Sequence, residues 1–84
     1  MDFTPTEFDI LSILIQNAGK VVTQHRIIQK VWRSGYADET RLLRVNISNI
    51  RKKIETSPNK PDYILTEIGI GYRLQDEAQN QRKK

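Results

Sequence analysis

The sequence predicts a mainly helical α+β domain in which three helices are followed by a C-terminal β-hairpin. Apolar residues recur at intervals of three and four through the first two thirds of the chain, which is the periodicity of amphipathic helices. Beyond the polar loop at residues 57–62, residues that favour strands flank a short turn containing glycine. With 84 residues, we expect one small domain whose core is near the lower size limit for independent folding.

The first helix has a clear start signal. Thr4 supplies a hydroxyl at the N-cap, Pro5 follows at the first helical position, and Glu7 stands at the third, which is the pattern of a capping box. Phe3 and Phe8 flank this box at the positions of a hydrophobic staple. The apolar face that follows is expected to comprise Ile10, Leu11, Leu14 and Ile15.

The second helix is expected to follow a short extended segment. Gly19, which can adopt a left-handed conformation, ends the first helix, and residues 21–22 are suited to a very short strand. Thr23 then caps a helix that runs to about Trp32. Its core-facing residues are predicted to be Ile27, Ile28, Val31 and Trp32. The connector that follows, from about 33 to 38, is longer than the turn of a minimal helix-turn-helix.

The third helix should be capped by Asp38 or Thr40 and must end before Pro58, because proline disfavours helical geometry in the residue ahead of it. Apolar residues recur along it at steps of four, three and four, which predicts one buried stripe. This stripe consists of Leu43, Ile47, Ile50 and Ile54.

The opposite side of the third helix is cationic. Between positions 41 and 53 the basic residues are Arg41, Arg44, Arg51, Lys52 and Lys53, and no acidic residue is present. Ser48 and Asn49 add hydrogen-bonding groups to this side, and Val45 adds an apolar one. Such a mixture suits base edges flanked by phosphates, so we interpret the segment as a DNA-recognition helix. The net charge of +4 agrees with a polyanionic partner, although the clustering is the stronger indication.

The hairpin is predicted from residues 63–66 and 72–74, with a turn at 69–71. Three helices followed by a hairpin make a winged helix-turn-helix. We expect the domain to span residues 1–75 and residues 76–84 to be a polar, disordered tail.

Individual side chains of the cationic helix have alternative roles. Asn49 can pair with adenine and Arg44 with guanine, each contributing about 1–3 kcal/mol of discrimination. Val45 either meets a thymine methyl group or packs against a loop. Arg51 and Lys53 each suit a phosphate contact and, equally, a salt bridge to Glu55.

The aromatic residues and the strand threonine also have two interpretations. Trp32 is expected to fill the core while its indole N–H faces a partner at the domain edge. Thr66 either contacts phosphate or pairs across the strand, and Tyr63 and Tyr72 are expected to pack within the hairpin.

Other residues exclude classes of function. The absence of cysteine excludes disulfides and thiolate zinc sites. His25 suits a solvated or capping role, and Asp38 and Glu39 suit charges at a helix start. No catalytic constellation or phosphate-binding glycine loop is present, so we expect no enzyme, cofactor or metal site. The apolar run Ile13–Ile15 is too short to span a bilayer and the N-terminus lacks the features of a signal peptide. These observations predict a soluble, cytoplasmic protein with no membrane partner.

The chain resembles the C-terminal DNA-binding domain of OmpR/PhoB-type response regulators. The matching segments, in the family's order and spacing, are Phe3–Phe8, Gly19–Thr23, Val31–Trp32, Ile50–Ile54 and Gly69–Arg73. Within the family, the segments 43–45 and 63–73 are most similar to the KdpE branch, which controls potassium-transporter genes.

The resemblance implies sequence-specific binding of double-stranded promoter DNA, with the third helix in the major groove and the hairpin wing near the minor groove. It assigns contacts on the recognition helix to Arg41, Arg44, Val45, Ser48, Asn49, Arg51 and Lys52. It assigns backbone and wing contacts to Trp32, Thr66, Gly69, Tyr72 and Arg73. It also implies a phosphorylated receiver domain, a head-to-tail dimer on direct repeats, and contact with RNA polymerase through residues 33–40. An alternative from a different class is a protein-interaction module whose basic face binds an acidic partner.

Two departures from the family pattern affect these expectations. No segment before Phe3 can supply the family's N-terminal four-stranded sheet, so the chain is expected to be part of a longer regulator and monomeric by itself. The exposed side of the first helix should then carry apolar surface. In addition, Ile68 stands where many members have a wing arginine that enters the minor groove, which weakens the expectation of base readout by the wing.

Overall fold

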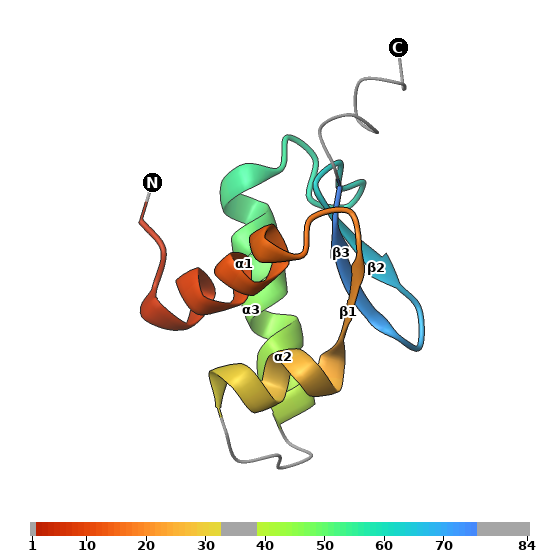
Figure 1. Cartoon of the computed structure of the whole chain (residues 1–84). Coiled ribbons are helices and arrows are strands. Elements are labelled where there is room, and N and C mark those ends of the chain that lie inside the picture. Colours follow the sequence, from red (N-terminus) through yellow and green to blue (C-terminus); the bar gives the residue numbers. More distant parts are fainter. Residues whose placement is uncertain (1, 33–38, 76–84) are drawn as a thin grey trace.

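The computed structural model describes residues 2–32 and 39–75. The elements along the chain are α1 (Pro5–Gln16), β1 (Val21–Thr23), α2 (Gln24–Val31), α3 (Glu39–Ile54), β2 (Ile64–Glu67) and β3 (Gly71–Leu74). Figure 1 shows the three helices gathered together, with a small sheet beside them. The predicted order of three helices followed by a hairpin wing is confirmed. The predicted connector at 33–38 and the tail at 76–84 lie outside the described residues.

The capping box of α1 is confirmed. The Thr4 hydroxyl oxygen accepts from the backbone N–H of Glu7 at 3.1 Å, and the Glu7 carboxylate accepts from the backbone N–H of Thr4 at 3.0 Å. Gly19 has a φ of 84°, as expected for the residue that lets the chain turn after the helix.

The apolar face of α1 is narrower than predicted. Ile10 and Leu14 are fully buried, whereas Ile15 is 56 % exposed and Phe8 is 61 % exposed. Phe8 and Ile15 are seven residues apart and therefore share a stripe, which lies about 200° around the helix from Ile10. The structure thus corrects the assignment of Ile15 to the core. It confirms the expectation of apolar surface on the exposed side of this helix.

The wing is part of a three-stranded antiparallel sheet with the order β1-β3-β2. The sequence predicted a hairpin and a separate extended segment, but β1 pairs with the free edge of β3, with Val22 opposite Tyr72. On the other side of β3, Thr66 stands opposite Tyr72. The extra strand lets the wing share backbone hydrogen bonds with the segment between α1 and α2.

The two wing glycines have different roles. Gly69 has a φ of 77° and lies in the turn, as predicted. Gly71 is in β3 rather than in the turn, and a Cβ atom there would overlap the carbonyl oxygen of Val22. Gly71 is therefore required because the backbone of β1 approaches β3 closely at this point.

The core lies between the helices and the sheet. Its fully buried large side chains are Ile10, Leu14, Ile27, Leu43, Ile47, Ile50 and Ile64. The predicted stripe of α3 is confirmed, with Ile54 packed at its margin. Because α3 begins at Glu39, Thr40 lies within its first turn and is not the cap; Asp38 lies outside the described residues. The helix ends at Ile54, ahead of Pro58 as predicted.

The loop between α3 and β2 is organised by a buried carboxylate. Glu55 is only 7 % exposed, and its oxygens accept from the backbone N–H groups of Asp62, Tyr63 and Ile64. The salt bridge to Glu55 that was one of the two expectations for Arg51 and Lys53 is not formed, and both side chains bind other partners. Tyr72 is buried as predicted, whereas Tyr63 is 42 % exposed and lies outside the buried core.

Candidate nucleic-acid interface

The outward side of α3 is a continuous cationic face, defined here as Arg41, Arg44, Val45, Ser48 and Lys52. All five are exposed, and Val45 is 50 % exposed despite being apolar. Among the described residues, the three cations of this face have no ion-pair partner. Asn49 is half-buried at the border of the face. The helix thus presents positive charge, a hydroxyl and a branched apolar group to the outside, as its sequence indicated.

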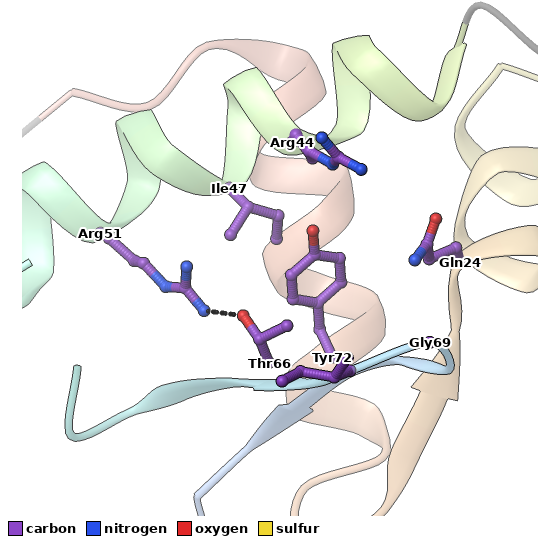
Figure 2. A pocket seen from close by; sticks show the side chains of 8 residues that line it. Gln24, Arg44, Ile47, Arg51, Thr66, Gly69 and Tyr72 are labelled. Carbon is purple, nitrogen blue, oxygen red and sulfur yellow. Dashed lines mark hydrogen bonds between the residues drawn. The ribbon is translucent and has the colours of Figure 1, made fainter. Parts of the chain in front are cut away.

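A groove of about 380 Å³ separates α3 from the wing. Its lining includes Gln24, Arg44, Arg51, Thr66, Ile68 and Gly69. Figure 2 shows that the arginines extend from the helix above, whereas Thr66 and Tyr72 rise from the sheet below. One side of α3, including Arg44 of the cationic face, and the wing are therefore two walls of one open concavity.

Arg51 points to the wing. Its Nε and Nη2 atoms donate to the carbonyl oxygen of Ile64 at 3.1 and 2.8 Å, and Nη2 also donates to the Thr66 hydroxyl oxygen at 2.8 Å. The guanidinium carbon lies 5.9 Å from the centre of the Tyr72 ring, within the range of a cation–π contact. Of the two roles expected for Arg51, the salt bridge to Glu55 is not formed, and the side chain joins α3 to β2.

Lys53 points to the opposite flank, toward α1. Its Nζ atom lies 2.6 Å from Glu7 Oε1, donates to the carbonyl oxygen of Asp2 at 2.7 Å, and is 5.3 Å from the centre of the Phe3 ring. The hydrogen bond from Lys53, with that from the Thr4 backbone, lowers the pKa of the buried Glu7 carboxyl below its ordinary value of 4.5. The sequence indicated only the capping role of Glu7, because its second partner is distant along the chain.

Arg73 and Trp32, two further candidate residues, are not among the residues that line the groove. Arg73 pairs with Glu67 at 3.0 Å and donates to Gln75, so its charge is largely compensated within the sheet. Ile68, at the turn, is 91 % exposed. Trp32 is half-buried against the core at the end of α2, as expected of its ring.

Residues 2–32 and 39–75 contain neither a metal-binding cluster nor a membrane-spanning helix. This part of the chain has no group of three or more acidic, histidine or cysteine side chains placed to hold a metal ion. It also has no helix with the length and apolar character needed to cross a membrane.

The chain is similar to known transcription regulators. Residues 1–74 match the family described as "Transcriptional regulatory protein, C terminal". The transcriptional regulatory protein KdpE of Mycobacterium tuberculosis is 43 % identical over 72 residues, which are 86 % of this chain and 32 % of that protein. The KDP operon regulator KdpE of Escherichia coli is 41 % identical over 71 residues, covering 84 % of this chain and 32 % of that protein. The chain thus spans about a third of the length of the curated relatives it matches.

Solved structures are similar in fold. The response regulator DrrB of Thermotoga maritima, an OmpR/PhoB homologue, superposes with a TM-score of 0.80 and 39 % identity, covering 89 % of this chain and 34 % of DrrB. The DNA-binding domain of Klebsiella pneumoniae RstA, solved in complex with the RstA box, has a TM-score of 0.79 and 26 % identity, covering 88 % of this chain and 73 % of that one. The resemblance to the KdpE branch is confirmed, and the chain belongs to the family of C-terminal domains of OmpR/PhoB-type transcriptional regulatory proteins.

Proposed function

We propose that this domain binds double-stranded DNA by inserting α3 into the major groove while the wing lies near the adjacent minor groove. The domain acts in DNA-binding transcription regulation, as its family and its relatives do. The observation that carries the mode of binding is the cationic face of α3, where three exposed cations lack an ion-pair partner within the described chain. A helix fits the width of the major groove, and the charges favour the phosphates on both sides of it.

Sequence readout is assigned to three side chains on or beside this face. Arg44 is exposed and long enough for a bidentate pair with guanine, and Asn49 offers an amide suited to adenine. Val45 presents an exposed apolar surface, which suits the methyl group of thymine. Each specific pair of this kind discriminates by about 1–3 kcal/mol against a wrong base.

The DNA backbone is assigned to the groove between α3 and the wing. When a helix occupies the major groove, one flanking strand must pass between the helix and the wing. Arg44, Gln24 and Thr66 line that passage, and the exposed Gly69 allows close approach of a backbone N–H. Tyr72 is buried and belongs to the groove lining, so it is proposed to support this backbone contact from beneath. Trp32 and Arg73 lie outside this lining and are proposed to contact the DNA backbone elsewhere.

The whole protein is proposed to contain more than this domain. The chain spans about a third of its curated relatives, which leaves length for a receiver domain whose phosphorylation drives dimerisation. Two copies of the effector domain would then bind direct repeats head-to-tail. Contact with RNA polymerase through residues 33–40 and a cytoplasmic location belong to the same proposal.

A binding assay over a salt series tests this function. Duplexes are first selected by the wild-type chain from a random-sequence library, and one containing two direct repeats is compared with its scrambled counterpart. We expect tighter binding to the selected duplex at every salt concentration, with a slope of about 0.9 log units per phosphate neutralised. Equal affinities throughout would leave only nonspecific electrostatic binding. Preferential binding to an acidic polypeptide would favour the protein-interaction alternative.

A further inference from the structure

We propose that Arg51 is a positioning residue for DNA binding, which orients the Thr66 hydroxyl as a phosphate donor and does not contact DNA itself. This inference rests on the proposed function and specifies how one wall of its groove works. It departs from the simpler expectation that every arginine on the recognition helix contacts DNA.

Arg51 holds the edge strand of the sheet. In the order β1-β3-β2, strand β2 has β3 on one side only, so its other edge has backbone groups without a strand partner. The carbonyl oxygen of Ile64 accepts from Arg51, and the N–H of the same residue donates to Glu55 Oε2 at 2.9 Å. Arg51 and Glu55 are one helical turn apart. Together they satisfy both backbone groups of Ile64 and attach β2 to the C-terminal end of α3.

Two of the three nitrogens of the Arg51 guanidinium, Nε and Nη2, donate within the protein. Two of its nitrogens share one carbonyl oxygen, one of them also reaches Thr66, and the group lies over the Tyr72 ring. A two-pronged contact of DNA with the Nε and Nη2 atoms of Arg51 would require these interactions to be lost and would leave the part-buried Ile64 carbonyl without its donor. Arg44 lines the same groove, is exposed, and has no ion-pair partner in the described chain, so it is the arginine of this groove that is available to DNA.

The contact with Arg51 determines which way Thr66 donates. A hydroxyl has one hydrogen, and because the Thr66 oxygen accepts from a cation, that hydrogen must point away from Arg51. Thr66 is exposed and lines the groove, so its O–H is directed to whatever occupies that space. A donor polarised by a neighbouring cation is matched by an anionic oxygen. In the proposed complex this oxygen belongs to a DNA phosphate.

A thermodynamic cycle between the protein and single phosphates tests the proposal. The probe is the duplex selected by the wild-type chain, together with copies in which one phosphate at a time is replaced by a neutral methylphosphonate. The first protein variant, Thr66→Val, removes the hydroxyl at nearly constant shape. The second, Arg51→Lys, keeps the positive charge but cannot donate from two nitrogens at once. The third carries both substitutions.

We expect one methylphosphonate position to weaken wild-type binding roughly 10- to 100-fold, the range for a single hydrogen bond to a charged group. This penalty should vanish in Thr66→Val and shrink strongly in Arg51→Lys. In the double variant, the effect of the methylphosphonate at that position on affinity should be the same as in Thr66→Val alone. A purely structural role of Arg51 would instead weaken binding to all the modified duplexes equally, and that result would overturn the proposal.

The salt dependence separates positioning from direct contact. Arg51→Met should leave the slope of log affinity against log salt nearly unchanged, as should the control Lys20→Met, which removes an exposed cation outside the groove. Lys52→Met, which removes an exposed cation of the cationic face, should reduce the slope by about 0.9. A loss of that size in Arg51→Met would show that Arg51 neutralises a phosphate and would overturn the proposal. Two-dimensional NMR spectra confirm that each variant is folded, and Thr66→Val keeps the test decisive if Arg51 variants lose the wing.

The same experiment distinguishes the two proposals. If the wild-type chain shows no preference for the selected duplex, the proposed function fails. If it has that preference but no phosphate position is coupled to Thr66 and Arg51, only the positioning role fails.

Discussion

Lys53 Nζ, in the last turn of α3, lies 2.6 Å from Glu7 Oε1, in the first turn of α1. This ion pair connects the C-terminal end of α3 to the N-terminal end of α1. Glu7 has a second role in the same place, because its carboxylate also accepts from the Thr4 backbone in the capping box. One buried carboxylate therefore starts α1 and attaches it to the recognition helix.

The stability of the domain should depend on the ionisation of Glu7. Its pKa is lowered in the folded state, first by the hydrogen bond from Lys53 and then by that from Thr4, so folding favours the carboxylate. The contribution is complete above the ordinary pKa of 4.5 and is lost as pH falls through the lower, folded value. Urea unfolding from pH 6 to pH 3 should show stability falling with acidity, and Glu7→Gln should reduce this slope.

Glu7→Gln should also cost about 1.5–3 kcal/mol at neutral pH, the usual range for a hydrogen bond to a charged group. Lys53→Met serves as the matched partner variant. The double variant should be little less stable than either single one, because both remove the same contact. Fully additive losses would show that the two side chains act independently.

The Glu55 carboxylate should be essential to the placement of the wing. Glu55→Gln replaces an acceptor oxygen with a donor that faces the N–H groups of Asp62, Tyr63 and Ile64. We expect a loss of about 1–3 kcal/mol in unfolding free energy and faster hydrogen exchange at Ile64. The neighbouring exposed Thr56→Ala is the control and should have little effect. Unchanged exchange at Ile64 in Glu55→Gln would contradict the role of this carboxylate.

The two wing glycines should respond differently to the same substitution. Gly69→Ala meets no atom within 4 Å and costs only the strain of a positive φ, about 1–2 kcal/mol. Gly71→Ala places its methyl group on the backbone of β1, which no rotamer change can relieve, so we expect a loss of about 3 kcal/mol or more. Thermal unfolding of both variants measures the difference. Equal losses would mean that β1 can move away from β3 at little cost.

Substitutions at Asn49 and Lys52 should affect DNA binding differently, because Asn49 is assigned to sequence readout and Lys52 to nonspecific electrostatic attraction. Asn49→Ala should relax the preference at one base position by about 1–3 kcal/mol, since it removes a contact to one base edge. Lys52→Ala should weaken binding to all sequences similarly and reduce the salt slope by about 1. Affinities for a set of single-base variants of the selected duplex measure both effects. If Asn49→Ala alters neither affinity nor preference, the assignment of this residue to the DNA-binding side is wrong.

The isolated 84-residue chain should be monomeric without DNA. The exposed large apolar side chains of α1 are Phe8 and Ile15, which are far fewer than the roughly 20–30 residues that each partner contributes to a stable interface. Sedimentation equilibrium measures the state directly. A tight dimer would contradict the expectation, and Phe8→Ser would then show whether the face of α1 forms it.

The sequence by itself determined the features that depend on neighbouring residues. The capping box at Thr4, the buried stripe from Leu43 to Ile50 and the exposed position of Arg44 follow from spacings of three and four along one helix. The turn at Gly69 follows from the backbone freedom of one residue. These features are local, so hydrophobic periodicity and cap chemistry were enough to place them.

The tertiary structure decided which of several possible partners each charged side chain took. Arg51, Lys53 and Glu55 lie on or next to the same helix end, and the sequence allowed them to pair with one another. Instead, Arg51 donates to Ile64, which is 13 positions away, and Lys53 donates to Glu7, which is 46 positions away. Glu55 accepts from backbone groups up to Ile64, 9 positions away at the start of β2. The pairing of β1 with β3 likewise could not be predicted from the sequence, because a strand of three residues pairs only when packing of the core brings the two segments together. Packing of the helices against the sheet sets these distances, and no local pattern encodes them.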